Sequence, residues 1–134
     1  MADEPMFRLM GYHRRRYRLA NGWSIRFRII STLASTGRPH GIKYAFTLHD
    51  TDGLRLLGFD NAHGIPRAET YDHRHPFRRL TDLKAYEFRS ADDLICDFFA
   101  AVERACRQEG VPFEVDAEEI ELEAEDESEP EEPR

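Results

Sequence analysis

The sequence predicts a single α+β domain: an antiparallel β-meander of about five strands, covered on one face by a C-terminal amphipathic helix and followed by a disordered acidic tail. Three observations predict this fold class. Apolar and polar residues alternate along several short segments, as in strands with one buried face. A later segment carries an apolar stripe at helical spacing. Acids dominate the chain after residue 113. We therefore expect one domain over 1–113 and a tail over 114–134.

The first two predicted strands form a hairpin. Tyr17 and Leu19 alternate with arginines, and Asn21-Gly22 is a typical two-residue hairpin turn. The segment 23–29 then places bulky apolar residues on one face and serine and arginine on the other. This alternation indicates a sheet that is buried on one face only.

Two longer strands and a short one follow. Apolar residues alternate with other types over 42–49, and the turn at 50–53 returns the chain as a strand over 54–59. The stretch 60–76 has no clear period, so we expect an irregular excursion. A short fifth strand is predicted at 84–88.

One long helix is predicted from Ser90 onward. Ser90 is a good N-cap, and Gly110 and Pro112 end the helix. Such a helix must bury its stripe against the sheet. The stripe consists of Leu94, Ile95, Phe98, Phe99, Val102, Ala105 and Cys106.

The acidity of the chain belongs to its end. Its formal net charge is −7, yet residues 114–134 hold twelve acids and one base, which leaves +4 for residues 1–113. A segment this acidic buries too little apolar surface to offset its ordering entropy, although Val115, Ile120 and Leu122 could extend an ordered edge. A basic body suits RNA or DNA, and an acidic tail can compete for the same surface. The alternative is that the tail only aids solubility.

The sequence predicts a cytoplasmic protein that does not enter a membrane. No apolar run approaches the roughly 18 residues that span a bilayer, and the N-terminus lacks a signal-peptide pattern. Cys96 and Cys106 are about three turns apart on the predicted helix, too far to bond, and we expect both to be buried, reduced thiols.

Histidines and acids gather between His40 and His75, where five of the six histidines lie. Histidine exchanges protons near neutral pH, and a neighbouring acid can fix its tautomer. One such group could deprotonate a ribose 2′-hydroxyl while another protonates the leaving oxygen, cleaving RNA without a metal. The alternative is that these side chains make ordinary turn and surface hydrogen bonds. The candidate catalytic residues are His49, Asp60, His63, Asp72, His73 and His75.

The same cluster permits a metal site, which we rank below acid–base use. His73 and His75 point the same way in an extended segment, and Pro76 favours that conformation. Together with His63 and Asp60 they could bind Zn²⁺ or Mn²⁺. The His-x-His spacing is a weak signal, so no cofactor is favoured and a divalent metal is the alternative.

Basic residues on the polar face of the predicted strands form a candidate nucleic-acid surface. Arginine can neutralise phosphates, and exposed tyrosines could add base stacking. The alternative is a solvated face on which arginine serves solubility. The candidate residues are Arg16, Arg18, Arg26, Arg28 and Lys43, with Arg74 from the histidine-rich segment. No Walker A, GxSxG, HExxH or paired CxxC motif is present.

Several of these stretches together resemble the TumE family. They are Trp23-Ser24-Ile25-Arg26-Phe27, Pro39-His40-Gly41-Ile42-Lys43-Tyr44, Leu48-His49-Asp50, Gly53, Gly58-Phe59-Asp60-Asn61-Ala62-His63 and Tyr71-Asp72-His73-Arg74-His75. The similarity runs from about Tyr12 to Gly110, and Phe-Asp-Asn-Ala-His is its most specific part. The resemblance implies a toxin of a toxin–antitoxin pair, whose partner is usually a helix-turn-helix DNA-binding protein. It supplies no catalytic assignment, so the site rests on the residues themselves.

The leading hypothesis is a toxin that acts on RNA as a small endoribonuclease neutralised by a partner protein. The second is a binding module without catalysis, which would use the same surface for nucleic acid or a regulator. The third is a metal-dependent nuclease or phosphodiesterase centred on Asp60, His63, His73 and His75. A homo-oligomer is compatible with the sequence.

Overall fold

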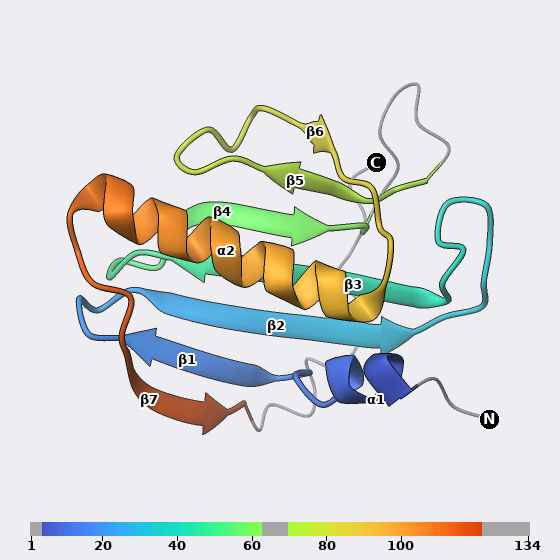
Figure 1. Cartoon of the computed structure of the whole chain (residues 1–134), viewed down its shortest axis with the longest axis horizontal. Coiled ribbons are helices and arrows are strands. Elements are labelled where there is room, and N and C mark those ends of the chain that lie inside the picture. Colours follow the sequence, from blue (N-terminus) through green and yellow to red (C-terminus); the bar gives the residue numbers. More distant parts are fainter. Residues whose placement is uncertain (1–3, 63–69, 122–134) are drawn as a thin grey trace.

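The computed structural model describes residues 4–62 and 70–121, which form a seven-stranded antiparallel sheet and two helices (Figure 1). The strand order is β6-β5-β4-β3-β2-β1-β7. The elements in chain order are α1 (Glu4–Met10), β1 (Arg15–Leu19), β2 (Ser24–Ser31), β3 (Ile42–His49), β4 (Arg55–Asp60), β5 (His73–His75), β6 (Lys84–Ala85), α2 (Ala91–Glu109) and β7 (Val115–Ile120).

The α+β class and the single long helix are confirmed. Helix α2 lies across one face of the sheet (Figure 1). Its first turn is capped by the Ser90 hydroxyl, which accepts a hydrogen bond from the Asp93 backbone N–H at 3.0 Å. It ends at Gly110, which adopts the left-handed conformation with φ of 78°.

The core fills the space between α2 and the sheet. Phe27 of β2 is its centre: its ring meets Phe46 of β3 and Phe98 of α2 edge-on, with centroids 5.1 and 5.6 Å apart. Phe59 of β4 meets the same Phe98 ring at 5.8 Å. Because side chains alternate along a strand, every second residue of β1 to β5 is directed to the opposite side of the sheet, which we call the far face.

Four details differ from the sequence-based expectation. The sheet has seven strands rather than about five. Helix α1 was not expected, since seven residues are too few to show a helical period. Strand β5 lies inside the stretch expected to be irregular. Of the two cysteines expected to be buried, Cys106 is buried and Cys96 is exposed, and both are free thiols.

The acidic segment also differs from the expectation, because its residues Val115–Ile120 are a strand rather than disordered chain. β7 pairs antiparallel with β1, where Glu118 forms an ion pair with Arg15 at 3.1 Å and Glu119 with Arg18 at 3.8 Å. Backbone pairing and these charges order the strand without a buried apolar face, and the residues after 121 lie outside the described part of the chain. Across residues 4–62 and 70–121, neither helix is long and apolar enough to cross a bilayer.

Candidate functional site: a His/Asp cluster on an arginine-bearing sheet face

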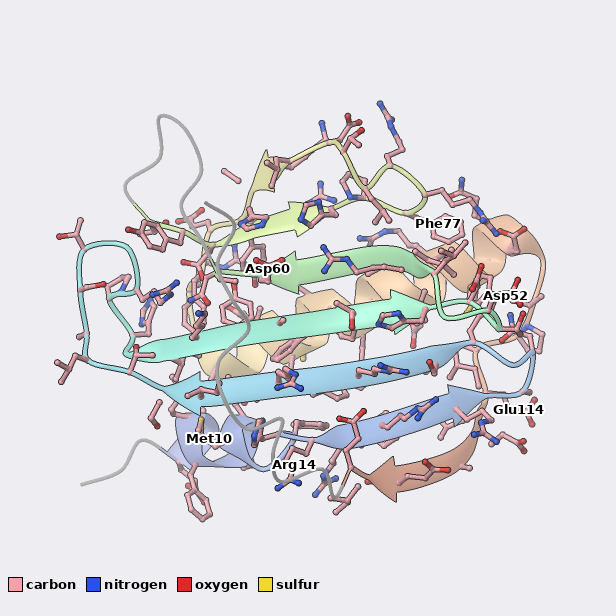
Figure 2. The ribbon with its side chains drawn as sticks, turned by 180° about the vertical axis from the view of Figure 1, so that it is seen from behind. Met10, Arg14, Asp52, Asp60, Phe77 and Glu114 are labelled. Atoms are coloured by element: carbon pink, nitrogen blue, oxygen red, sulfur yellow. The ribbon has the colours of Figure 1, made fainter. Side chains whose placement is uncertain are left out.

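Strand register brings distant polar residues into rows across the far face (Figure 2). Directly paired residues of antiparallel strands share a face, so each row can be followed from strand to strand. One row is Arg16, Arg26, Thr47, Gly58 and His75. The next is Arg28, Ala45, Asp60 and His73. Each row therefore begins with arginine on β1 or β2 and ends with a histidine on β5.

Asp60, His73 and His75 form a compact cluster where β4 meets β5. The Asp60 Oδ1 atom lies 3.2 Å from His73 Nε2, and Oδ2 lies 3.8 Å from His75 Nε2. One ligand atom from each of the three side chains lies within 4.8 Å of the others. The cluster is deeply placed: His73 is 0%, Asp60 4% and His75 9% exposed.

The residues that follow Asp60 hold its carboxylate in position. The Ala62 backbone N–H donates to Asp60 Oδ1 at 3.1 Å. The side chain of Asn61 takes the place of a strand neighbour for β3: its Oδ1 accepts from the Tyr44 N–H and its Nδ2 donates to the Ile42 carbonyl, both at 2.9 Å. The hydrogen bonds of the Asp-Asn-Ala sequence therefore end β4 and hold the Asp60 carboxylate in position.

Both imidazoles are oriented by backbone carbonyls. His73 Nδ1 donates to the Tyr71 carbonyl at 2.9 Å, and His75 Nδ1 donates to the Leu80 carbonyl at 2.7 Å. Because a carbonyl can only accept, Nδ1 carries the proton in each ring. The Nε2 atoms of both rings are thereby directed toward Asp60.

The buried environment shifts the pKa values within the cluster. Burial alone would raise the pKa of Asp60, but the hydrogen bond and charge of His73 bring it below the ordinary value. Burial would lower the pKa of His73, and the same contact with Asp60 raises it instead. For His75, burial prevails and the pKa is lowered. The first two shifts favour an ionised Asp60–His73 pair.

Two of the predicted catalytic residues lie apart from this cluster. His49 is on the far face, where its Nε2 accepts from the Thr47 hydroxyl at 2.8 Å and its Nδ1 donates to the Gly53 carbonyl at 3.2 Å. Asp72 instead accepts from the hydroxyl of Tyr44, a side chain of the face covered by α2, at 2.7 Å. Burial raises the pKa of Asp72. Asp72 is thus hydrogen-bonded to a core residue on the side covered by α2. His63, the remaining predicted catalytic residue, lies outside the described residues.

Five of the six predicted nucleic-acid residues share the far face, and four of them are at least partly exposed: Arg16, Arg18, Arg26 and Arg28. Three of them line a groove of about 470 Å³ beside the turn at 50–53. Lys43 belongs to this face by alternation but is only 4% exposed. Arg74 pairs with Phe59 and lines a pocket under α2, so it lies on the other side of the sheet.

The sequence-based reasoning missed Arg55 and Gly58. Arg55 pairs with His49 across β3 and β4. Burial lowers the pKa of both His49 and His75, and the positive charge of Arg55 adds to this lowering. Gly58 sits between Thr47 and His75, and a Cβ placed there would lie 3.7 Å from Arg55 Nε. The strand 54–59 had been predicted, so counting alternate residues from Asp60 was the signal that would have placed Gly58 on this face.

Fold and site together define a small α+β protein that carries a His/Asp cluster and a row of arginines on one sheet face. A family model described as Toxin TumE matches residues 5–106 of the chain. The chain therefore belongs to the TumE toxin family, as its motifs suggested, and family membership makes it the toxin component of a toxin–antitoxin system. No match was found among curated proteins or among solved structures.

Proposed function

We propose that this toxin acts on RNA as a small endoribonuclease whose reaction centre is the Asp60/His73/His75 cluster. The observation that carries the proposal is the register of the sheet. It places the cluster and the arginines Arg16, Arg26 and Arg28 in adjoining rows of the same face. A strand of RNA lying along the rows would contact both.

The arginines supply the binding half of the function. Guanidinium groups neutralise phosphates and release counterions, so such a face binds a polyanion without regard to its sequence. RNA is favoured over a protein target because the far-face arginines gather on adjacent strands, where several of them can neutralise phosphates of one RNA strand. A cytoplasmic site of action follows from this choice of target.

The cluster supplies the chemical half. A phosphodiester placed over Gly58 would meet no side chain of that residue and would lie beside Arg55 and His75. Arg55 would stabilise the negative charge that develops on the phosphoryl oxygens, and the cluster would activate the attacking oxygen.

The burial of His73 limits how the cluster can act. With no exposed surface it cannot itself exchange a proton with RNA, so it is a positioning residue for Asp60. Among the predicted histidines that the structure describes, His75 in the cluster and His49 in the neighbouring row are therefore the candidates for proton transfer to RNA.

An antitoxin partner follows from membership of the family. We propose that this partner is a helix-turn-helix DNA-binding protein, as the family resemblance implies. Copurification of the two proteins from a strain that expresses both would test the pairing.

The endoribonuclease proposal is tested with the purified full chain and a labelled RNA. We expect internal cleavage by the wild-type chain, and a loss of about 100-fold or more in His75→Gln, the range that proton transfer or charge stabilisation contributes to catalysis. His40→Gln, the same substitution at an exposed histidine that stacks on Phe88, is the matched control that should cleave normally. No cleavage of any RNA by the wild-type chain would refute the proposal.

A further inference from the structure

We infer that Asp60, His73 and His75 bind one divalent transition-metal ion, of the class of Mn²⁺, Fe²⁺ or Zn²⁺. The inference deepens the proposed function, because it names what activates the attacking oxygen, but the binding of the ion is measurable without RNA. It rests on the geometry of the three side chains, taken in turn below.

The distances fit a shared ion. Two ligand atoms that each lie about 2.0–2.2 Å from one metal are roughly 3–4 Å apart. Asp60 Oδ1 and His73 Nε2 are 3.2 Å apart, and Asp60 Oδ2 and His75 Nε2 are 3.8 Å apart. All three ligand atoms fall within 4.8 Å of one another, so an ion can be accommodated by small side-chain rotations.

The tautomers fit as well. A histidine that binds a metal through Nε2 usually donates its Nδ1–H to a carbonyl or carboxylate, which fixes the ring and makes the other nitrogen more basic. His73 and His75 both do so, toward the carbonyls of Tyr71 and Leu80. These bonds come from two different loops, yet both direct Nε2 toward the same carboxylate.

Hydrogen bonding within the cluster accounts for only part of this arrangement. His73 is within reach of Asp60 Oδ1, which also accepts from the Ala62 N–H. His75 Nε2, at 3.8 Å from Oδ2, is too far for a hydrogen bond. A cluster that served only to hold Asp60 would need one histidine. A bound ion explains why a second imidazole converges on the other carboxylate oxygen.

The ligand types select the class of ion. Imidazole nitrogen suits Zn²⁺ and Fe²⁺, and carboxylate oxygen suits Mn²⁺, whereas Ca²⁺ and Mg²⁺ are usually bound by oxygen ligands alone. Two histidines and one carboxylate leave coordination positions for water and for a phosphate oxygen, as in catalytic rather than structural sites. Gly58, opposite His75 in the register, presents no side chain of its own to such a phosphate oxygen.

The test uses the full chain, freed of metal by a chelator and titrated with Co²⁺ as a spectroscopic probe. We expect one Co²⁺ per chain, with visible absorption bands characteristic of nitrogen and oxygen coordination, and displacement of those bands by Zn²⁺. We also expect the bound metal to raise the melting temperature, because an ion that binds only the folded state stabilises it.

Matched variants identify the ligands. His75→Gln and Asp60→Asn should each weaken Co²⁺ binding by about tenfold or more, since even residues behind the ligands affect affinity on this scale. His40→Gln, an exposed histidine that stacks on Phe88, should bind Co²⁺ as the wild type does. Circular dichroism of each variant separates lost binding from lost folding.

The outcomes distinguish the inference from the function it deepens. The metal site is overturned if the wild-type chain does not bind stoichiometric Co²⁺, or if His75→Gln binds Co²⁺ as the wild type does. In that case, RNA cleavage by the metal-free chain would still support the proposed endoribonuclease activity. Conversely, tight cluster-dependent Co²⁺ binding without RNA cleavage supports the metal site and overturns the proposed function.

Discussion

At the residue scale, the candidate site depends on the short sequence that ends β4. Asp60 supplies the carboxylate, Asn61 replaces backbone partners for β3, and the N–H of Ala62 fixes one oxygen of Asp60. The Phe-Asp-Asn-Ala-His run stood out in the sequence, and its first part has a structural explanation in these hydrogen bonds. A site residue and its support are thus encoded in adjacent positions.

The first prediction concerns Asn61, which is 2% exposed. Asn61→Ala leaves the Tyr44 N–H and the Ile42 carbonyl without their side-chain partner in the core, so the free energy of unfolding should fall by about 2 kcal/mol or more. Urea denaturation measures it. Gln108→Ala, which removes an exposed amide from α2, should change stability by only about 0.5 kcal/mol. Equal effects of the two substitutions would contradict the role assigned to Asn61.

The second prediction separates function from stability at Gly58. A Cβ there meets the Phe46 carbonyl and the Thr47 methyl at 3.4 Å, close but tolerable contacts. Since glycine weakens a strand, Gly58→Ala should keep the unfolding free energy or raise it by up to about 1 kcal/mol. It should still slow RNA cleavage severalfold by filling the space beside Arg55. Unchanged cleavage would place the phosphate elsewhere.

At the element scale, β7 is the strand that links the acidic segment to the basic sheet. It lies beyond residues 5–106, the part that the family model matches, and it covers the edge of β1. Its glutamates Glu118 and Glu119 are paired with Arg15 and Arg18. Glu119 lies in register with Arg16, so we expect it to compete with phosphates for the far-face arginines. Glu118 lies in register with Tyr17, on the side covered by α2.

The third prediction tests that competition without removing the strand. Glu119→Gln should tighten RNA binding at low salt and hardly change it at high salt, because exposed charges are screened there. Fluorescence anisotropy with labelled RNA measures the affinity. The control Glu118→Gln changes the net charge equally on the same strand but lies on the side covered by α2, where it pairs with Arg15. If both substitutions tighten binding equally, Glu119 has no specific role.

The elements also show what periodicity can and cannot predict. Apolar alternation located β2, β3 and β4, and the apolar stripe with its caps located α2. Strand β5 was not predicted because its sequence, His-Arg-His, has no apolar residue from which a period could be read. It forms a strand by pairing with β4. Strand β7 was not predicted for a related reason: it is ordered by ion pairs and backbone pairing and has no buried apolar face.

The same limit applies to the site. Asp60, His73 and His75 were among the predicted residues, and the far-face arginines of β1 and β2 followed from alternation. Asp72 and Arg74 were predicted as site residues but lie away from the cluster. They stand one residue before and one residue after His73, and because side chains alternate along an extended segment, both are directed to the other side of the sheet. A one-residue offset cannot be resolved before the register is known.

At the scale of the whole molecule, the fold has two unlike sides. Helix α2 buries the apolar side chains of the sheet, and the far face collects arginines over β1 and β2 and the His/Asp cluster over β4 and β5 (Figure 2). The proposed function assigns RNA binding and catalysis to different strands of this one face.

The fourth prediction tests which side binds RNA. Arg26→Glu with Arg28→Glu should weaken binding and flatten the dependence of log affinity on log salt concentration by about 0.7 for each single-strand phosphate contact that is lost. The matched reversal Arg104→Glu with Arg107→Glu on α2 should change the slope little. An unaltered slope in the first pair, with the fold intact, would move the RNA surface off the far face.

The central claim is that the toxin acts through the Asp60/His73/His75 cluster, and growth after induced expression without the antitoxin tests it most directly. The wild-type chain should arrest growth, whereas Asp60→Asn, accumulating to the same level as a folded protein, should permit it, because the substitution removes the charge that both histidines face. Asp82→Asn, an exposed carboxylate paired with Arg79, should arrest growth as the wild type does. Growth arrest by folded Asp60→Asn as complete as that by the wild type would contradict the account.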